Sequence, residues 1–118
     1  MLKNWLRQWR DRYVQDQAWQ VPLPEFGDSP RVRRRVRFSG RVQNVGFRME
    51  VCQLSSRLGL TGWCENLPDG DVLAELQGPE NRILFVISFM ESLKRICITE
   101  KRMEELPLVP GERDFRQR

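Results

Sequence analysis

A glycine-framed stretch, GRVQNVGFR (residues 40–48), carries residue types that bind phosphate. A turn held by Gly40 and Gly46 frees several backbone N–H groups to point at one spot. An apolar segment with helical spacing follows from Phe47, and the N-terminus of a helix favours negative charge. Arg48 enters that helix, where its planar guanidinium can bind two phosphate oxygens. The stretch therefore predicts a phosphate-binding loop.

The chain has no histidine, which excludes a catalytic triad with a histidine base and removes the commonest ligand of transition metals. Its three cysteines, Cys52, Cys64 and Cys97, are far apart and form no C-x-x-C motif. A disulfide framework and a zinc site are both poor interpretations of this pattern. We therefore expect chemistry that uses no metal and no cofactor, and reduced thiols that fit a cytoplasmic protein.

The length of 118 residues fits one folded domain, and the 40% content of hydrophobic residues is typical of a globular protein. No apolar run is long enough for a transmembrane helix, and the first residues lack the pattern of a secretion signal. The net charge of +4 is compatible with a nucleic acid, an anionic membrane or a small anionic substrate, and does not choose between them.

Hydrophobic periodicity predicts the elements that position the loop. The sequence predicts strands over 31–39, 60–66, 72–77 and 96–104, helices from 47 to 58 and from 80 to 94, and a short extended piece around 115. This order is typical of an α+β split βαβ fold, in which an antiparallel sheet carries both helices on one face. The first strand places four arginines on its second face, a row that could contact nucleic-acid phosphates but is more simply a solvated face: Arg31, Arg33, Arg35 and Arg37.

The first 30 residues differ from the rest of the chain. Residues 1–18 predict a helix with an aromatic stripe, and residues 21–30 contain three prolines and read as a linker. We therefore expect an N-terminal extension over 1–29 and a folded domain over 30–118. The stripe could pack on the domain, pair with a second copy, or lie on a membrane surface, and the segment could also be disordered: Leu2, Trp5, Leu6, Trp9 and Tyr13.

Two long motifs in register resemble the acylphosphatase family. The first is residues 40–48, which is similar to the family's G-x-V-Q-G-V-x-F-R. The second is GWCENLPDG (residues 62–70) with Val72, which is similar to G-W-V-x-N-x-x-D-G-x-V, and RLGLTGW (residues 57–63) between them is also typical. The resemblance covers about residues 30–118 and implies a ferredoxin-like βαββαβ sandwich.

The resemblance also implies a function and a site. Members of this family hydrolyse the carboxyl–phosphate anhydride of small acyl phosphates without a metal, by attack of a water molecule. The corresponding catalytic residues are Arg48, which binds phosphate, and Asn66, which positions the water. The residues that correspond to the phosphate-binding loop are Val42, Gln43, Asn44, Val45, Gly46 and Phe47. From the residues alone, Arg48 could form a surface ion pair and Asn66 could favour the turn that follows it.

The chain departs from the family pattern at a few positions. Asn44 stands where the family has glycine, so we expect asparagine to tolerate a positive φ there. Glu65 precedes Asn66 and should point to the opposite face of its strand, and Gln117 replaces an apolar residue of the tail. These departures keep open a catalytically weak or inactive domain that binds an anion or a protein.

An RNA-binding module is a third alternative, although no RNP1-like segment is present and we expect no nucleic-acid partner. We expect a monomer, or a weak homodimer through the N-terminal helix.

Overall fold

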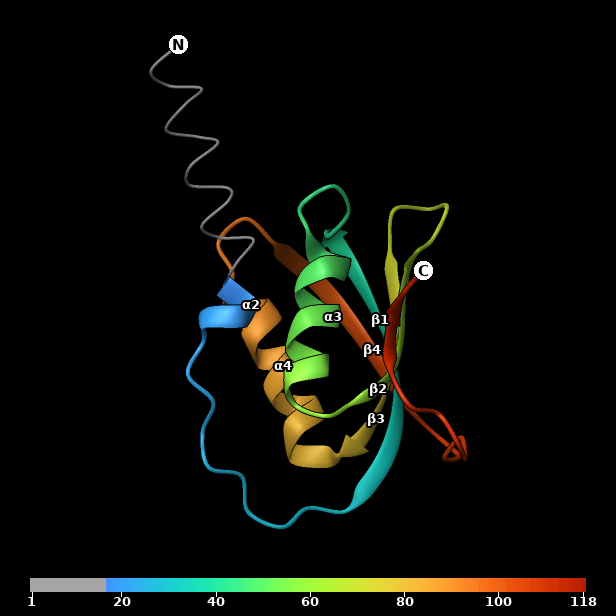
Figure 1. Ribbon diagram of the computed structural model, residues 1–118. Helices are drawn as coiled ribbons and strands as arrows, with labels where there is room; N and C mark the ends of the chain where they lie inside the picture. Colours follow the sequence, from blue (N-terminus) through green and yellow to red (C-terminus); the bar gives the residue numbers. More distant parts are fainter. Residues whose placement is uncertain (1–16) are drawn as a thin grey trace.

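The computed structural model describes residues 17–118 as a five-stranded sheet with helices on one face (Figure 1). The strand order across the sheet is β4-β1-β3-β2-β5. In chain order the elements are α2 (Gln17–Gln20), β1 (Arg31–Arg41), α3 (Phe47–Arg57), β2 (Thr61–Asn66), β3 (Val72–Pro79), α4 (Glu80–Ser92), β4 (Cys97–Leu106) and β5 (Phe115–Gln117).

The predicted α+β order is confirmed, with two differences in the sheet. From β1 to β4 the elements follow the expected βαββαβ arrangement, and β3 continues through Gly78 to Pro79. The short piece at Phe115 forms β5, which pairs parallel to β2, so the sheet is mixed. The chain leaves β4 at one edge of the sheet and returns along the opposite edge, which brings β5 beside β2 in the same direction.

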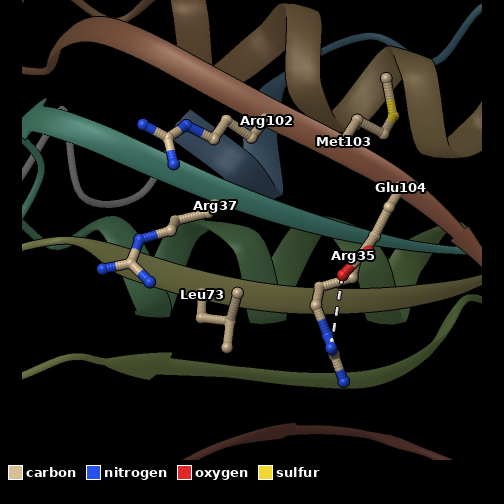
Figure 2. A pocket seen from close by; sticks show the side chains of 6 residues that line it. All are labelled: Arg35, Arg37, Leu73, Arg102, Met103 and Glu104. Carbon is tan, nitrogen blue, oxygen red and sulfur yellow. Dashed lines mark hydrogen bonds and ion pairs between the residues drawn. The ribbon is translucent and has the colours of Figure 1, made fainter.

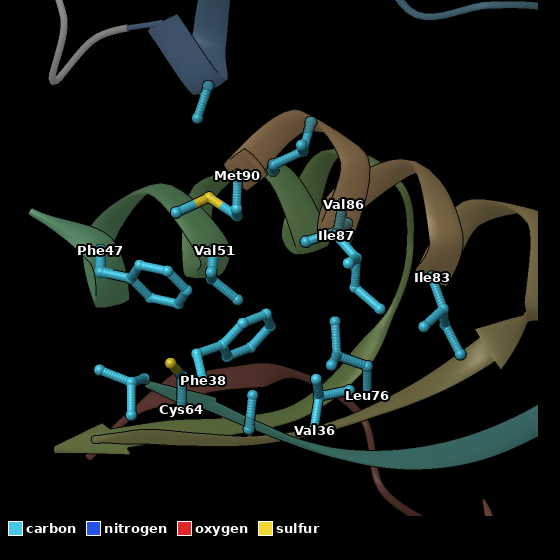
Figure 3. Packing of buried hydrophobic residues seen from close by; sticks show 14 of the residues in the cluster. Val36, Phe38, Phe47, Val51, Cys64, Leu76, Ile83, Val86, Ile87 and Met90 are labelled. Atoms are coloured by element: carbon cyan, nitrogen blue, oxygen red, sulfur yellow. The ribbon is translucent and has the colours of Figure 1, made fainter. Parts of the chain in front are cut away.

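Apolar side chains fill the space between the sheet and the two helices (Figure 3). Val36 and Phe38 project from β1, and the Phe38 ring lies 4.9 Å from the Phe47 ring of α3, measured between centroids. Strand β3 adds Ala74 and Leu76 to this layer. The alternation of apolar residues in β1 therefore faces the helices as predicted, because period-2 side chains share one face of a strand.

The other face of β1 differs from the solvated row that we expected, because Arg33 is buried with only 2% of its surface exposed. Its Nε lies 2.8 Å from Glu75 Oε1, and its Nη1 lies 2.8 Å from Glu112 Oε1. Arg35 Nη2 lies 2.7 Å from the second oxygen of Glu75. Burial of a charge is tolerated when an opposite charge compensates it, so the carboxylates of β3 and of the 107–114 loop explain the difference.

A groove of about 350 Å³ crosses this open face over β1, β3 and β4 (Figure 2). Its arginines are already paired: Arg35 with Glu75, Arg37 with Asp71, and Arg102 with Glu100. Three arginines of the row, Arg33, Arg35 and Arg37, are thus paired with carboxylates of the same molecule, which favours an ion-paired surface over a row that contacts nucleic-acid phosphates. The groove is lined by Arg35, Arg37, Leu73, Arg102, Met103 and Glu104.

The segment before β1 packs against the helices. Residues 21–30 contain no helix or strand, as predicted, and α2 buries Ala18 completely. Arg57 Nη1 donates to the Ala18 carbonyl at 2.6 Å, and the Phe26 ring meets the Phe85 ring of α4 edge-on at 5.6 Å. The predicted helix over 1–18 lies almost entirely outside the described residues. Within residues 17–118 no helix is long and apolar enough to cross a membrane.

The buried carboxylate of Glu75 should be a main electrostatic support of the sheet. Among the residues that the structure describes, replacing it (Glu75→Gln) leaves Glu112 as the one carboxylate paired with the buried Arg33 charge. We expect the free energy of unfolding at pH 7 to fall by about 3 kcal/mol, the low end for breaking a buried ion pair. Urea denaturation measures this change.

The matched control is Glu104→Gln, because the Glu104 side chain is 58% exposed and pairs with Arg35 at 3.3 Å. That exposed pair should contribute less than about 1 kcal/mol. Equal losses in the two variants would contradict the proposed role of Glu75.

The same carboxylate predicts how stability changes with pH. Burial raises the pKa of Glu75, but hydrogen bonds from Arg35 and Arg33 outweigh it and hold the pKa below its ordinary value of 4.5. A lowered pKa in the folded state stabilises the protein above the unfolded value and loses that effect as the pH falls through the folded value. Wild type should therefore lose this contribution as the pH falls below 4.5, and Glu75→Gln should show a flatter decline. Parallel stability curves in urea from pH 6 to pH 2 would contradict this expectation.

Candidate active site

The loop of residues 42–46 connects β1 to α3, and a bulge in β1 sets its starting direction. The pairing of β1 with β4 shifts register between Ser39 and Gly40. Gly40 has a φ of 115°, and a Cβ there would lie 2.2 Å from the Cys97 carbonyl oxygen. Only glycine fits such a close approach of two strands. The bulge therefore turns the chain out of the sheet directly before the loop.

Two left-handed residues shape the loop. Asn44 has a φ of 60°, and Gly46, the residue that precedes α3, has a φ of 78°. Asn44 therefore adopts the positive φ that we expected asparagine to tolerate. Within residues 17–118, the N–H groups of residues 43–46 donate no hydrogen bond to another backbone group. Left-handed residues at alternate positions produce such a concave set of free N–H groups, which suits an anion.

Several of the predicted phosphate-binding residues direct their side chains into the hydrophobic core. Val42 and Phe47 are buried in the hydrophobic core, and Val45 packs partly against it. Their contacts with a phosphate could therefore come only from the backbone. The core thus anchors both ends of the loop, and the residues between them supply N–H groups.

The Gln43 side chain connects the loop to the hairpin that follows Asn66. Its Nε2 donates to the backbone oxygens of Leu67 and Asp71, both at 2.8 Å. Asn66 is the last residue of β2 and lies opposite Val72 of β3. The loop and the β2–β3 turn consequently lie at the same end of the molecule (Figure 1).

Arg48 lies in the first turn of α3, and its side chain approaches β2 through Arg118. Its Nη1 donates to the backbone oxygen of Arg118 at 2.6 Å, and the Arg118 N–H donates to the Cys64 carbonyl at 2.8 Å. Burial raises the pKa of the Cys64 thiol to about 12, and the Arg48 charge lowers it in part. Cys64 and Asn66 are two residues apart in β2 and so share one face. Arg48 and Asn66 are therefore brought to the same end of the helix-covered face.

This end of the sheet combines donors suited to phosphate chemistry. Free loop N–H groups and a guanidinium can bind the oxygens of a phosphoryl group, and the helix dipole favours its charge. The amide of Asn66 can both donate and accept hydrogen bonds, so it can orient a water molecule. Glu65, the acidic neighbour, lies opposite Leu73 and so faces the open side of the sheet.

Two residues near the loop were missed by sequence reasoning. Arg95, in the turn after α4, donates from Nε to the Val45 carbonyl at 2.5 Å. No local pattern links it to the loop, because the contact depends on the fold. Glu50 is fully buried on α3 near this arginine. Its spacing of three residues from Phe47 did place it on the apolar face, and a carboxylate at such a position signals a buried partner.

Comparison with known proteins gives consistent matches. The family described as acylphosphatase matches residues 34–116. An acylphosphatase of Clostridium beijerinckii is 40% identical over 80 residues, which cover 64% of this chain and 86% of the relative. One of Rhizobium etli is 42% identical over 88 residues, which cover 70% of this chain and 88% of the relative. The solved acylphosphatase of Bacillus subtilis is similar with a TM-score of 0.67 at 29% identity, covering 73% of this chain and 97% of that chain.

The Gln43 side chain should hold the loop in its binding conformation. We expect Gln43→Leu to lower the free energy of unfolding by about 1–2 kcal/mol, because two carbonyls lose their donor. Binding of inorganic phosphate should weaken by about tenfold, equivalent to about 1.4 kcal/mol. Calorimetric titration and urea denaturation measure the two quantities.

The control is Gln77→Leu, since Gln77 also makes two backbone hydrogen bonds, both to Val109 on the open face. It should lose stability and keep its phosphate affinity; a similar loss of affinity in both variants would refute the role of Gln43.

Proposed function

The chain belongs to the acylphosphatase family and is a hydrolase of acyl phosphates, and we propose that Arg48 and Asn66 carry its catalysis. The observation that supports this assignment is the loop of residues 43–46, whose N–H groups have no backbone partner within residues 17–118, with Arg48 in the first turn of α3. The substrate is a small molecule that carries a carboxyl–phosphate anhydride.

In the proposed mechanism the phosphoryl group lies in the loop. The N–H groups of residues 43–47 and the Arg48 guanidinium bind its oxygens and stabilise the charge that they carry in the transition state. The Asn66 amide holds a water molecule in line with the anhydride. The water oxygen forms a bond to phosphorus while the bond between phosphorus and the bridging oxygen breaks. The electron pair of that bond leaves with the carboxylate, and the water proton passes to phosphate or solvent.

The anhydride explains why a site without histidine suffices. A carboxylate is a stable anion and a good leaving group, so its departure needs no strong general acid. Phosphoryl transfer depends chiefly on positioning and on charge stabilisation. An arginine, an amide and backbone N–H groups supply both, and this scheme needs no metal.

The remaining proposals concern the surroundings of the site. We infer that the catalytic domain begins near residue 30 and that residues 1–29 are an extension, of which 17–29 pack on the helices. We also infer a cytoplasmic location from the cysteine pattern. The aromatic stripe predicted for residues 1–18 supports a monomer that self-associates weakly through this segment.

Hydrolysis of benzoyl phosphate in the presence of EDTA tests the catalytic assignment. We expect metal-independent turnover in wild type. Arg48→Ala and Asn66→Ala should each lower kcat/KM by about 10²–10³-fold, as loss of one transition-state donor does. The control is Arg116→Ala, because this arginine is exposed on β5 and pairs with Asp114, two residues before it. It should retain wild-type kinetics. Wild-type rates in folded Arg48→Ala would contradict the proposed site.

The N-terminal proposal is tested by removing residues 1–16, which keeps Ala18 in the core. Full-length protein should show a mass that rises with concentration in sedimentation equilibrium, and the truncated protein should stay at the monomer mass. Benzoyl phosphate turnover should be equal in both. Identical mass at all concentrations would rule out self-association through this segment.

A further inference from the structure

Residues on either side of Arg95 in the sequence are anchored in the hydrophobic core. It lies in the turn between α4 and β4, which is closed by a hydrogen bond from the Ile96 N–H to the Leu93 carbonyl at 3.1 Å. Leu93 and Ile96 are both buried. The backbone of Arg95 is therefore fixed relative to the sheet, which sets the starting point of its side chain.

The contact is with the backbone of the phosphate-binding loop. Arg95 Nε donates to the Val45 carbonyl oxygen at 2.5 Å. This carbonyl and the Gly46 N–H belong to one planar peptide unit, and in a trans peptide the two groups point in opposite directions. The peptide bonds described here are all trans. Fixing the carbonyl on the side of α4 therefore turns the Gly46 N–H to the other side.

A second contact balances a buried charge under the loop. Glu50 is fully buried in the first turn of α3, and its N–H donates to the Gly46 carbonyl at 3.1 Å. Arg95 Nη2 lies 3.9 Å from Glu50 Oε2. A carboxylate so close to the helix N-terminus would oppose a bound anion if nothing offset it. One guanidinium thus orients the loop and compensates the carboxylate.

We propose that Arg95 is a positioning residue of this site, which aims the Gly46 N–H at the phosphoryl group while its partner Glu50 keeps the guanidinium in place. The inference rests on the proposed function, because it concerns the same loop. It differs in its evidence, since it rests on the contacts of Arg95 with Val45 and Glu50.

The deciding experiment measures phosphate binding directly. Inorganic phosphate is titrated into ¹⁵N-labelled protein, and the Gly46 amide signal and the dissociation constant are followed. In Arg95→Met we expect the dissociation constant to rise about tenfold or more, a change of about 1.4 kcal/mol. The response of the Gly46 amide should shrink. With benzoyl phosphate, KM should rise by the same factor, and kcat should fall because the amide no longer meets the transition state.

A double variant separates positioning from stability. Arg95→Met alone removes a cation that faces the buried Glu50 carboxylate, so it could unfold the protein. Arg95→Met combined with Glu50→Leu removes both charges, and apolar replacement of a buried ion pair is commonly neutral or stabilising. We expect this double variant to fold as well as wild type and still to bind phosphate about tenfold more weakly.

The matched control is Arg82→Met. Arg82 Nη1 also donates to a backbone carbonyl, that of Leu58 at 2.9 Å, but at the opposite end of α3. It should lower thermal stability and leave the phosphate dissociation constant unchanged. Wild-type affinity and a wild-type Gly46 response in the folded double variant would overturn the inference. That outcome is distinct from failure of the catalytic assignment, which would appear as full turnover in Arg48→Ala with Arg95 intact.

Discussion

The left-handed loop between β1 and α3 is the constraint on which this structure depends. Within residues 17–118, the N–H groups of residues 43–46 have no backbone partner, and such groups are costly to leave unpaired. The positive φ of Asn44 is also uncommon for a residue other than glycine. The rest of the fold holds the loop in this conformation. The buried side chains of Val42 and Phe47 fix the ends of the loop, and Gln43 ties its middle to the next hairpin. The site is therefore a property of the whole end of the sheet.

The open face of the sheet has to accommodate a row of positive charges. Strand β1 is central, between β3 and β4, and yet it carries a row of arginines. The acids that pair with this row come from several places. Arg35 lies opposite Glu75 of β3 on one side and Glu104 of β4 on the other, and cross-strand pairs of opposite charge stabilise a sheet. Arg37 lies opposite Leu73 and Arg102, and its Nε pairs instead with Asp71, which precedes β3. The charges of Arg33, Arg35 and Arg37 are consequently compensated within the molecule.

Periodicity and turn chemistry were enough to predict the strands, the two helices and the loop. The alternation of Val36 and Phe38 located the buried face of β1, and the glycine pattern located the loop. What could not be predicted depends on contacts between distant segments. Arg33 is buried because the 107–114 loop brings Glu112 to it, and Arg95 meets Val45 because the turn after α4 ends beside the loop. No local sequence pattern predicts either of these two contacts.

The chemistry explains why such remote supports matter. An arginine, an asparagine and backbone amides do not change charge near neutral pH, so the proposed catalytic groups cannot adjust the reaction by titrating. Its catalytic power has to come from donors that are already aligned when the substrate arrives, since groups that must reorganise lose much of their effect. A buried carboxylate at Glu50 adds a local charge that opposes the substrate, and Arg95 is a cation placed to offset it. In the proposed site, the precision of the loop therefore depends on residues beyond those that bind the phosphate.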